Sequence, residues 1–141
     1  FCLSRGLGDV YKRQDVILCK AEIENNLNGP AAALPYLNQI RARAGAPEYG
    51  KHNRFPAPST KEAMNDAILK ERGYELVFEF QRRADLIRFG KYEEVVNAHL
   101  KKLGIAQPTN VTSSLRYFPY PLNDAQLNPN LAAENPSRLP K

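Results

Sequence analysis

The sequence predicts a mainly α-helical protein of tetratricopeptide-like helical hairpins, with long Pro- and Asn-rich loops and an extended C-terminal tail. Three observations predict this class. Apolar residues recur at helical spacing through several segments before residue 104. Glycine or proline stands at the boundaries between these segments. After residue 104 the helical pattern gives way to a stretch that contains six prolines and repeated asparagines.

Two amphipathic helices joined by a tight turn are predicted over residues 15–28 and 31–44. Their apolar stripes are Val16, Cys19, Ile23 and Leu27 in the first helix and Leu34, Leu37, Ile40 and Ala44 in the second. The polar side of the second helix, expected to face outward, is Gln39, Arg41 and Arg43. Gly29 suits the end of one helix and Pro30 the start of the next. The pair therefore predicts an antiparallel hairpin of the tetratricopeptide type, which needs further units to bury its face.

A longer helix is predicted after a loop rich in proline and glycine over residues 46–58. Ser59 and Glu62 form the pattern of a capping box, in which two side chains satisfy free backbone N–H groups at a helix start. We expect this helix to be the longest. Its predicted apolar side is Ala63, Ala67, Ile68, Tyr74, Val77 and Phe78. A further helix is predicted over residues 91–103, and Gly104 ends it.

The tail, residues 105–141, contains one short strand-like run at 115–120. We expect the tail to pack across the helices, because it carries too many apolar residues for a free linker. These are Phe118, Tyr120, Leu122, Leu127 and Leu131. Tyr117 and Tyr120 are possible contacts for a ligand or partner, because an aromatic face can stack on a sugar ring. The alternative is that they only supply buried area against the helices.

The first 14 residues have neither helical nor strand periodicity. They resemble translated adaptor sequence of the kind found at the ends of metagenomic fragments. We therefore expect residues 1–14 to be non-native and residues 15–141 to be part of a helical domain that continues upstream.

The composition excludes disorder of the whole chain, since 43% hydrophobic and 25% charged residues are ordinary for a globular protein. The formal net charge is +5, but most cations after residue 14 have an acidic neighbour within a helical turn. We expect solvated, ion-paired faces and no nucleic-acid binding. Cys2 and Cys19 allow neither a disulfide framework nor a C-x-x-C metal clamp. No apolar run approaches the ~20 residues that cross a bilayer.

A run of alternating acids and arginines is the most informative stretch of the chain. Glu71, Glu75 and Glu79 recur every fourth residue, which places three carboxylates on one helix face. Arginine can answer such a row because its planar group pairs with carboxylate oxygens while its stem packs on apolar neighbours. The predicted structural ion-pair network is Glu71, Arg72, Glu75, Glu79, Arg82, Arg83, Asp85 and Arg88.

Two functional interpretations of the acid row are weaker than this structural one. A metal site or a glycosidase-like acid/base pair would also use neighbouring carboxylates. No histidine lies near the three glutamates in the sequence, and four arginines lie close enough to pair with them. We expect no catalytic residue, no metal and no cofactor.

Three separated motifs resemble the C-terminal part of SusD/RagB-type proteins. The first is the run at 68–90, in which Ile-Leu-x-Glu-Arg leads into Glu-Leu-x-x-Glu, an arginine and Asp-Leu-x-Arg. The second is the Asn-x-x-Arg-x-Arg-Ala-Gly segment at 38–45. The third comprises the Pro-x-Pro, Asn-Pro-x-Leu and Asn-Pro elements of the tail. The family usually has Gly where Phe80 stands, so we expect a straighter helix junction there.

The resemblance implies a non-catalytic, lipid-anchored protein on the outer surface of the bacterial outer membrane. It implies that such a protein caps a SusC-like TonB-dependent transporter and delivers oligosaccharides or other nutrients to it. In that family the lipidated cysteine and most glycan-stacking aromatics lie upstream of this segment. Neither Cys2 nor Cys19 is therefore expected to be the anchor. The segment at 15–141 would be a structural portion of the binding protein.

Two other classes stay open on the residues alone. A helical-repeat module that binds a protein partner would share the hairpin, but it would leave the Asn-Pro tail without a role. A carbohydrate-active enzyme would need a positioned acid and base, and no such pair stands out in the sequence.

Overall fold

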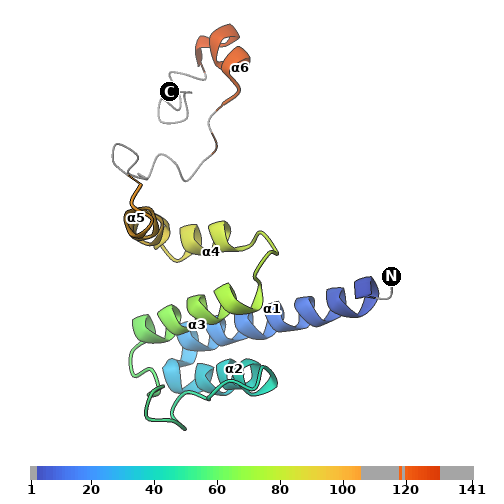
Figure 1. The fold of residues 1–141 in the computed structure, drawn as a ribbon, viewed down its shortest axis with the longest axis vertical. Helices are drawn as coiled ribbons and strands as arrows, with labels where there is room; N and C mark the ends of the chain where they lie inside the picture. The colour runs from blue at the N-terminus through green and yellow to red at the C-terminus, as the bar shows by residue number, and fades with distance from the viewer. Residues whose placement is uncertain (1–2, 106–117, 119, 131–141) are drawn as a thin grey trace. The chain divides into compact units, whose positions relative to one another are not determined.

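The computed structural model describes residues 3–105, 118 and 120–130. This part of the chain is mainly helical and has no strand beyond an isolated bridge between His52 and Phe55, which confirms the predicted class. Its helices are α1 (Leu3–Asn28), α2 (Pro30–Arg43), α3 (Lys61–Glu75), α4 (Arg82–Arg88), α5 (Tyr92–Lys102) and α6 (Leu122–Leu127) (Figure 1). The tetratricopeptide-like character of the hairpins stays a prediction.

The chain divides into two compact units, residues 1–85 and 86–141. In the first unit α2 runs back beside α1, and α3 packs against both helices (Figure 1). Gly29 separates α1 from α2, and Pro30 begins α2 as predicted. The fully buried side chains at the centre of these helices are Leu18, Leu37, Met64, Ile68 and Asn25. Three helices therefore share one small core.

The face of α1 that packs against the core is not the predicted one. Val16, Ile23 and Leu27 are 65%, 56% and 74% exposed. The buried face includes Leu18 and Asn25 instead. Asn25 is accommodated because its amide donates hydrogen bonds of 2.8 Å to the Lys61 carbonyl and to Asn65 Oδ1. Helical spacing identified an apolar stripe correctly, but it did not show which side of the helix its partners would cover.

The start of α1 also differs from the prediction. The helix begins at Leu3 and includes residues that were expected to be non-native, rather than beginning at Asp15. No proline stands between these two positions, so nothing removes a backbone donor from the helical ladder. Extending an existing helix costs far less than nucleating a new one. The expectation that residues 1–14 are non-native stays a prediction.

The third helix is shorter than expected and begins one residue later. Thr60, not Ser59, is the capping residue, and its hydroxyl accepts a 3.1 Å hydrogen bond from the Ala63 N–H. The helix ends at Glu75 after 15 residues, whereas α1 has 26. The prediction of a Ser59 capping box and of the longest helix here was wrong. Several residues of the predicted apolar side are exposed, namely Ala63, Tyr74, Val77 and Phe78.

The chain leaves the helical path between α3 and α4. Phe78 and Phe80 have φ angles of 66° and 59°, in the left-handed region that glycine favours. The expected straightening at Phe80 is therefore wrong, because this backbone turns although a phenylalanine occupies the position. The turn lets Arg82 reach back to α3, where its guanidinium donates a 2.7 Å hydrogen bond to the Leu69 carbonyl. Gly73 permits this approach, since a Cβ there would lie 2.8 Å from that guanidinium.

In the second unit, α5 agrees with the predicted helix at 91–103 to within one residue at each end. Gly104 closes it with a φ of 69° and donates to the Lys101 carbonyl, while Ile105 donates to the Leu100 carbonyl. These two hydrogen bonds satisfy carbonyls that the helix end would leave free. Gly45 ends α2 in the same way.

The described part of the tail does not bury its apolar residues as expected. Phe118, Leu122 and Leu127 are 71%, 57% and 84% exposed. Residues 122–127 form α6, a single short helix whose length leaves little room for a continuous apolar face. The rest of the predicted strand-like run and Leu131 lie outside the described residues.

Replacing Phe80 by glycine should raise the free energy of unfolding by about 1 kcal/mol. The left-handed conformation costs a residue with a Cβ about this much free energy, and glycine avoids the cost. The ring is 96% exposed, so its removal costs little burial. Urea unfolding of the full-length protein measures the effect. Phe80→Ala is the matched control, since it removes the ring but keeps the Cβ. An equal gain from both variants would contradict the backbone explanation.

Candidate functional site

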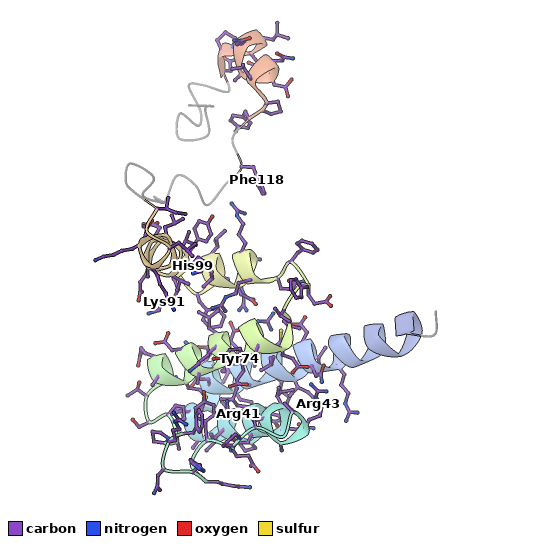
Figure 2. The ribbon with its side chains drawn as sticks, in the orientation of Figure 1. Arg41, Arg43, Tyr74, Lys91, His99 and Phe118 are labelled. Atoms are coloured by element: carbon purple, nitrogen blue, oxygen red, sulfur yellow. The ribbon has the colours of Figure 1, made fainter. Side chains whose placement is uncertain are left out.

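A buried arginine lies between α2 and α3 at the centre of the first unit. Arg41, labelled in Figure 2, is 4% exposed. It forms an ion pair with Glu71, which is 5% exposed. Its Nε also donates a 2.6 Å hydrogen bond to the Pro47 carbonyl. The guanidinium therefore joins α2, α3 and the loop between them. A buried charge of this kind is stable only when paired and hydrogen-bonded.

Two aromatic rings of that loop cover the same guanidinium. The carbon at its centre lies 4.5 Å from the Tyr49 ring centroid and 4.6 Å from the Phe55 centroid. The two rings meet edge to face at 5.9 Å. Burial, followed by the charge of Glu71, raises the pKa of the Tyr49 hydroxyl. Cation–π contact supplements the ion pair and holds the loop over Arg41.

Asn38 fixes the loop from one helical turn before Arg41. Its amide donates to the Tyr49 carbonyl at 3.0 Å, and its Oδ1 accepts from the Tyr49 N–H at 2.8 Å. Residues three positions apart share a helix face, so the spacing of Asn38 and Arg41 directs both side chains at the same loop. This geometry explains why the Asn-x-x-Arg part of the second motif has that spacing.

A second buried arginine ties α3 to α1 and to α4. Arg72 is 4% exposed; its Nε lies 2.8 Å from Asp85, and another of its nitrogens lies 2.7 Å from Asp15. It also donates to the Cys19 sulfur at 3.6 Å. Burial alone would lower the pKa of Arg72, but its hydrogen bonds and charge interactions with Asp85 and Asp15 outweigh burial and raise it. Arg72 stays charged at every accessible pH.

A third ion pair, near the surface, follows the same acid row. Glu75 pairs with Arg43 of α2 at 2.6 Å, and the Arg43 side chain is 52% exposed. Glu79, in the turn after α3, is exposed and forms no ion pair with any described residue. Glu79 therefore does not continue the helix face that carries Glu71 and Glu75, because α3 ends at Glu75.

The structure gives the acid row different partners from those that sequence proximity favoured. Glu71 and Glu75 pair with Arg41 and Arg43, which were expected to face outward. That expectation was wrong for Arg41, which is buried. The sequence did indicate that Arg41 is buried, because Arg41 lies four residues after Leu37 and next to Ile40, on the buried face of α2.

The other members of the predicted network have separate positions. Arg72 and Asp85 pair with each other, and Arg82 binds a backbone carbonyl of α3. Arg83 lies half-buried on α4. Arg88 lies over the Phe89 ring, 4.7 Å from its centroid. Whether the eight residues act only as a framework stays a prediction.

Of the two candidate contact tyrosines, the structure describes Tyr120. Tyr120 is half-buried in the second unit, and Tyr117 lies outside the described residues. Within residues 3–105, 118 and 120–130, no three side chains of the metal-binding types gather as a possible metal site. None of the described helices is long and apolar enough to span a bilayer.

A groove of about 640 Å³ opens beside the Arg41–Glu71 pair. One wall is the loop that follows α2, and the other is the last turn of α3. Its lining is Ile40, Arg41, Ala44, Ala46, Pro47, Arg54, Phe55, Lys70, Glu71, Tyr74 and Glu75. This volume lies within the range of small-molecule binding sites.

A smaller cavity of about 240 Å³ lies between α1 and α2. Gln14 lines it, is 3% exposed, and has no hydrogen-bond partner among the described residues for either amide atom. Gln39 and Arg43 line the opposite side. A buried amide without partners loses its hydration without compensation. Position 14 is therefore a weak point of the core.

Comparison with known proteins shows consistent similarity. The model of the SusD family matches residues 14–137. SusD-like protein P25 of Formosa agariphila is 38% identical over 120 residues, which cover 85% of this chain and 22% of that protein. SusD-like protein P38 of the same organism is 35% identical over 89 residues, or 62% and 18% of the two chains.

A third relative, SusD-like protein P2 of Formosa agariphila, is 30% identical over 128 residues, which are 86% of this chain and 24% of that protein. The chain thus spans about a fifth to a quarter of the length of the curated relatives it matches. No solved structure matches the chain significantly.

Arg41→Met should lower the free energy of unfolding by about 3–5 kcal/mol, because it leaves the Glu71 carboxylate buried without its partner. Arg43→Met is the matched control on the next pair along the same helices. Its loss should be smaller, about 1–2 kcal/mol, since the Arg43 side chain is 52% exposed, although the Glu75 side chain that it leaves is only 10% exposed. Urea unfolding of both full-length variants gives the comparison. Equal losses would show that burial does not distinguish the two pairs.

Gln14→Leu should raise the free energy of unfolding by about 1–3 kcal/mol, because it removes a buried amide that lacks partners. Gln39→Leu, on the exposed side of the same cavity, should change stability by less than about 0.5 kcal/mol. Thermal unfolding of the two variants tests the difference. A destabilised Gln14→Leu variant would show that the amide has a partner in solution.

Proposed function

The chain belongs to the SusD family, and from that premise we propose that it is the structural C-terminal portion of a non-catalytic nutrient-binding protein. The whole protein acts at the outer surface of the bacterial outer membrane, where a lipid anchor upstream of this segment holds it. Its partner is a TonB-dependent, SusC-like transporter, and its ligand is an oligosaccharide. The family match over residues 14–137 carries this proposal.

The geometry of the charged residues supports a non-catalytic role. The two buried carboxylates of the described residues, Glu71 and Asp85, each lie on a buried arginine. A general acid or base needs a carboxyl group that can reach the reacting bond of a substrate, whereas these two are buried and bound to an arginine. These acids suit a framework better than a reaction.

The position of Cys19 supports an anchor elsewhere in the protein. Cys19 lies within α1, half-buried, and accepts a hydrogen bond from Arg72. Burial, followed by the charge of Asp15, raises the pKa of its thiol. A less acidic thiol is a weaker nucleophile at neutral pH, so this cysteine is poorly suited to acylation.

One observation favours a second candidate, a helical-repeat module that binds a protein partner. Val16, Ile23 and Leu27 form an exposed apolar stripe on α1, which is the kind of face that repeat proteins stack on further helices. Under the first proposal another segment of the same protein covers this stripe, whereas under the second a partner protein covers it.

Co-purification from the native host distinguishes them. Full-length protein with an affinity tag, extracted in mild detergent, should retain a TonB-dependent outer-membrane transporter encoded in the same host. An unrelated outer-membrane lipoprotein with the same tag is the control. Retention of a soluble protein in place of a transporter would favour the repeat module. Shortening of a polysaccharide by the purified protein would overturn the non-catalytic assignment.

A further inference from the structure

The groove beside the Arg41–Glu71 pair has acidic and basic residues in its lining, and the acidic ones are already neutralised. Glu71 is paired with Arg41. Glu75 is paired with Arg43, and its side chain is only 10% exposed. A ligand in the groove therefore meets little free negative charge.

Two basic residues of the lining, unlike the acidic ones, have no ion-pair partner among the described residues. Arg54 comes from the loop and Lys70 from α3, and both are exposed. Neither side chain forms an ion pair with a described residue. The unpaired charge of the groove is therefore positive and comes from both walls. Arginine and lysine placed in this way favour an anionic group between them, and arginine can bind a carboxylate or sulfate through two parallel hydrogen bonds.

An aromatic ring lies in the same groove. Tyr74 is 64% exposed and projects from the last turn of α3 (Figure 2). The small residues Ala44, Ala46 and Pro47 belong to the opposite wall. An open ring with a hydroxyl at its tip offers an apolar face and one polar contact. That combination suits a sugar ring, which has an apolar C–H face and hydroxyl groups at its edge.

We propose that this groove binds an acidic oligosaccharide. A carboxylate or sulfate ester of the ligand lies between Arg54 and Lys70, and an adjoining sugar ring stacks on Tyr74. This inference rests on the proposed nutrient-binding function and names the chemical class of the nutrient. The groove is separate from the buried pair below it, since Arg41 is committed to Glu71, to Pro47 and to two aromatic rings.

Isothermal titration of the full-length protein tests the proposal with three probes. An oligogalacturonate carries only carboxylates, a κ-carrageenan oligosaccharide carries only sulfate esters, and a malto-oligosaccharide is neutral. The wild-type protein should bind at least one acidic probe more tightly than the neutral one. That binding should weaken as sodium chloride is added, because salt screens exposed charges. The acidic probe that binds better identifies the anionic group.

The variant that removes both cations is Arg54→Ala with Lys70→Ala. It should reduce the preference for the acidic over the neutral probe by tenfold or more. The matched control is Lys51→Ala with Lys101→Ala, which removes the same net charge at exposed residues outside the groove lining. Tyr74→Ala should weaken binding, and Tyr74→Phe should retain most of it. Melting curves of all variants check that each is folded.

Three results would overturn the proposal, and they differ from one another. In the first, the variant that lacks Arg54 and Lys70 still binds carbohydrate with an unchanged preference for the acidic probe. That result would show that the groove is not the binding site, but it would not contradict the nutrient-binding function. A lower melting temperature with unchanged affinity would show that an acidic segment of the protein itself occupies the groove. Failure of the wild-type protein to bind any carbohydrate, acidic or neutral, would count against the proposed function as well.

Discussion

The fold of the first unit depends on two buried guanidinium groups, each of which is paired with one buried carboxylate. Arg41 joins α2 to α3 through Glu71, and Arg72 joins α3 to α1 and α4 through Asp15 and Asp85. A small three-helix core of this kind buries little apolar area. The ion pairs define which surfaces of the helices meet, because any other arrangement would leave a buried charge without its partner. The apolar contacts then fill the space that these pairs outline.

The same pairs give a physical reason for the family motifs. Asn38 and Arg41 are spaced to hold one loop against α2. Arg72 forms an ion pair with Asp85, and the sharp turn of the backbone after α3 brings Asp85 within reach. That turn requires left-handed residues, and this chain places Phe78 and Phe80 there. The backbone strain at the junction is thus tolerated because the polar contacts on either side of it depend on the turn.

Helix positions were largely predictable from the sequence, because they follow from local signals. Glycine at 45 and 104 marked two helix ends correctly, and the helix at 91–103 was placed to within a residue. The buried faces were harder to predict. Val16, Ile23 and Leu27 have ideal spacing yet are exposed, since spacing does not reveal which side is covered. The partner of Glu71 was missed for a related reason. Arg41 lies 30 residues away, and sequence proximity favoured nearer arginines.

The buried Asn25 has a consequence for how the helices can move. Its amide binds the Lys61 carbonyl and Asn65, both at the start of α3. Sliding α1 along α3 by one helical turn, about 5.4 Å, would break both bonds and strand the amide among apolar side chains. Small apolar contacts alone would tolerate several alignments, whereas this one residue selects a single register. The two hydrogen bonds therefore make the packing of α1 on α3 resist shear along the helix axes.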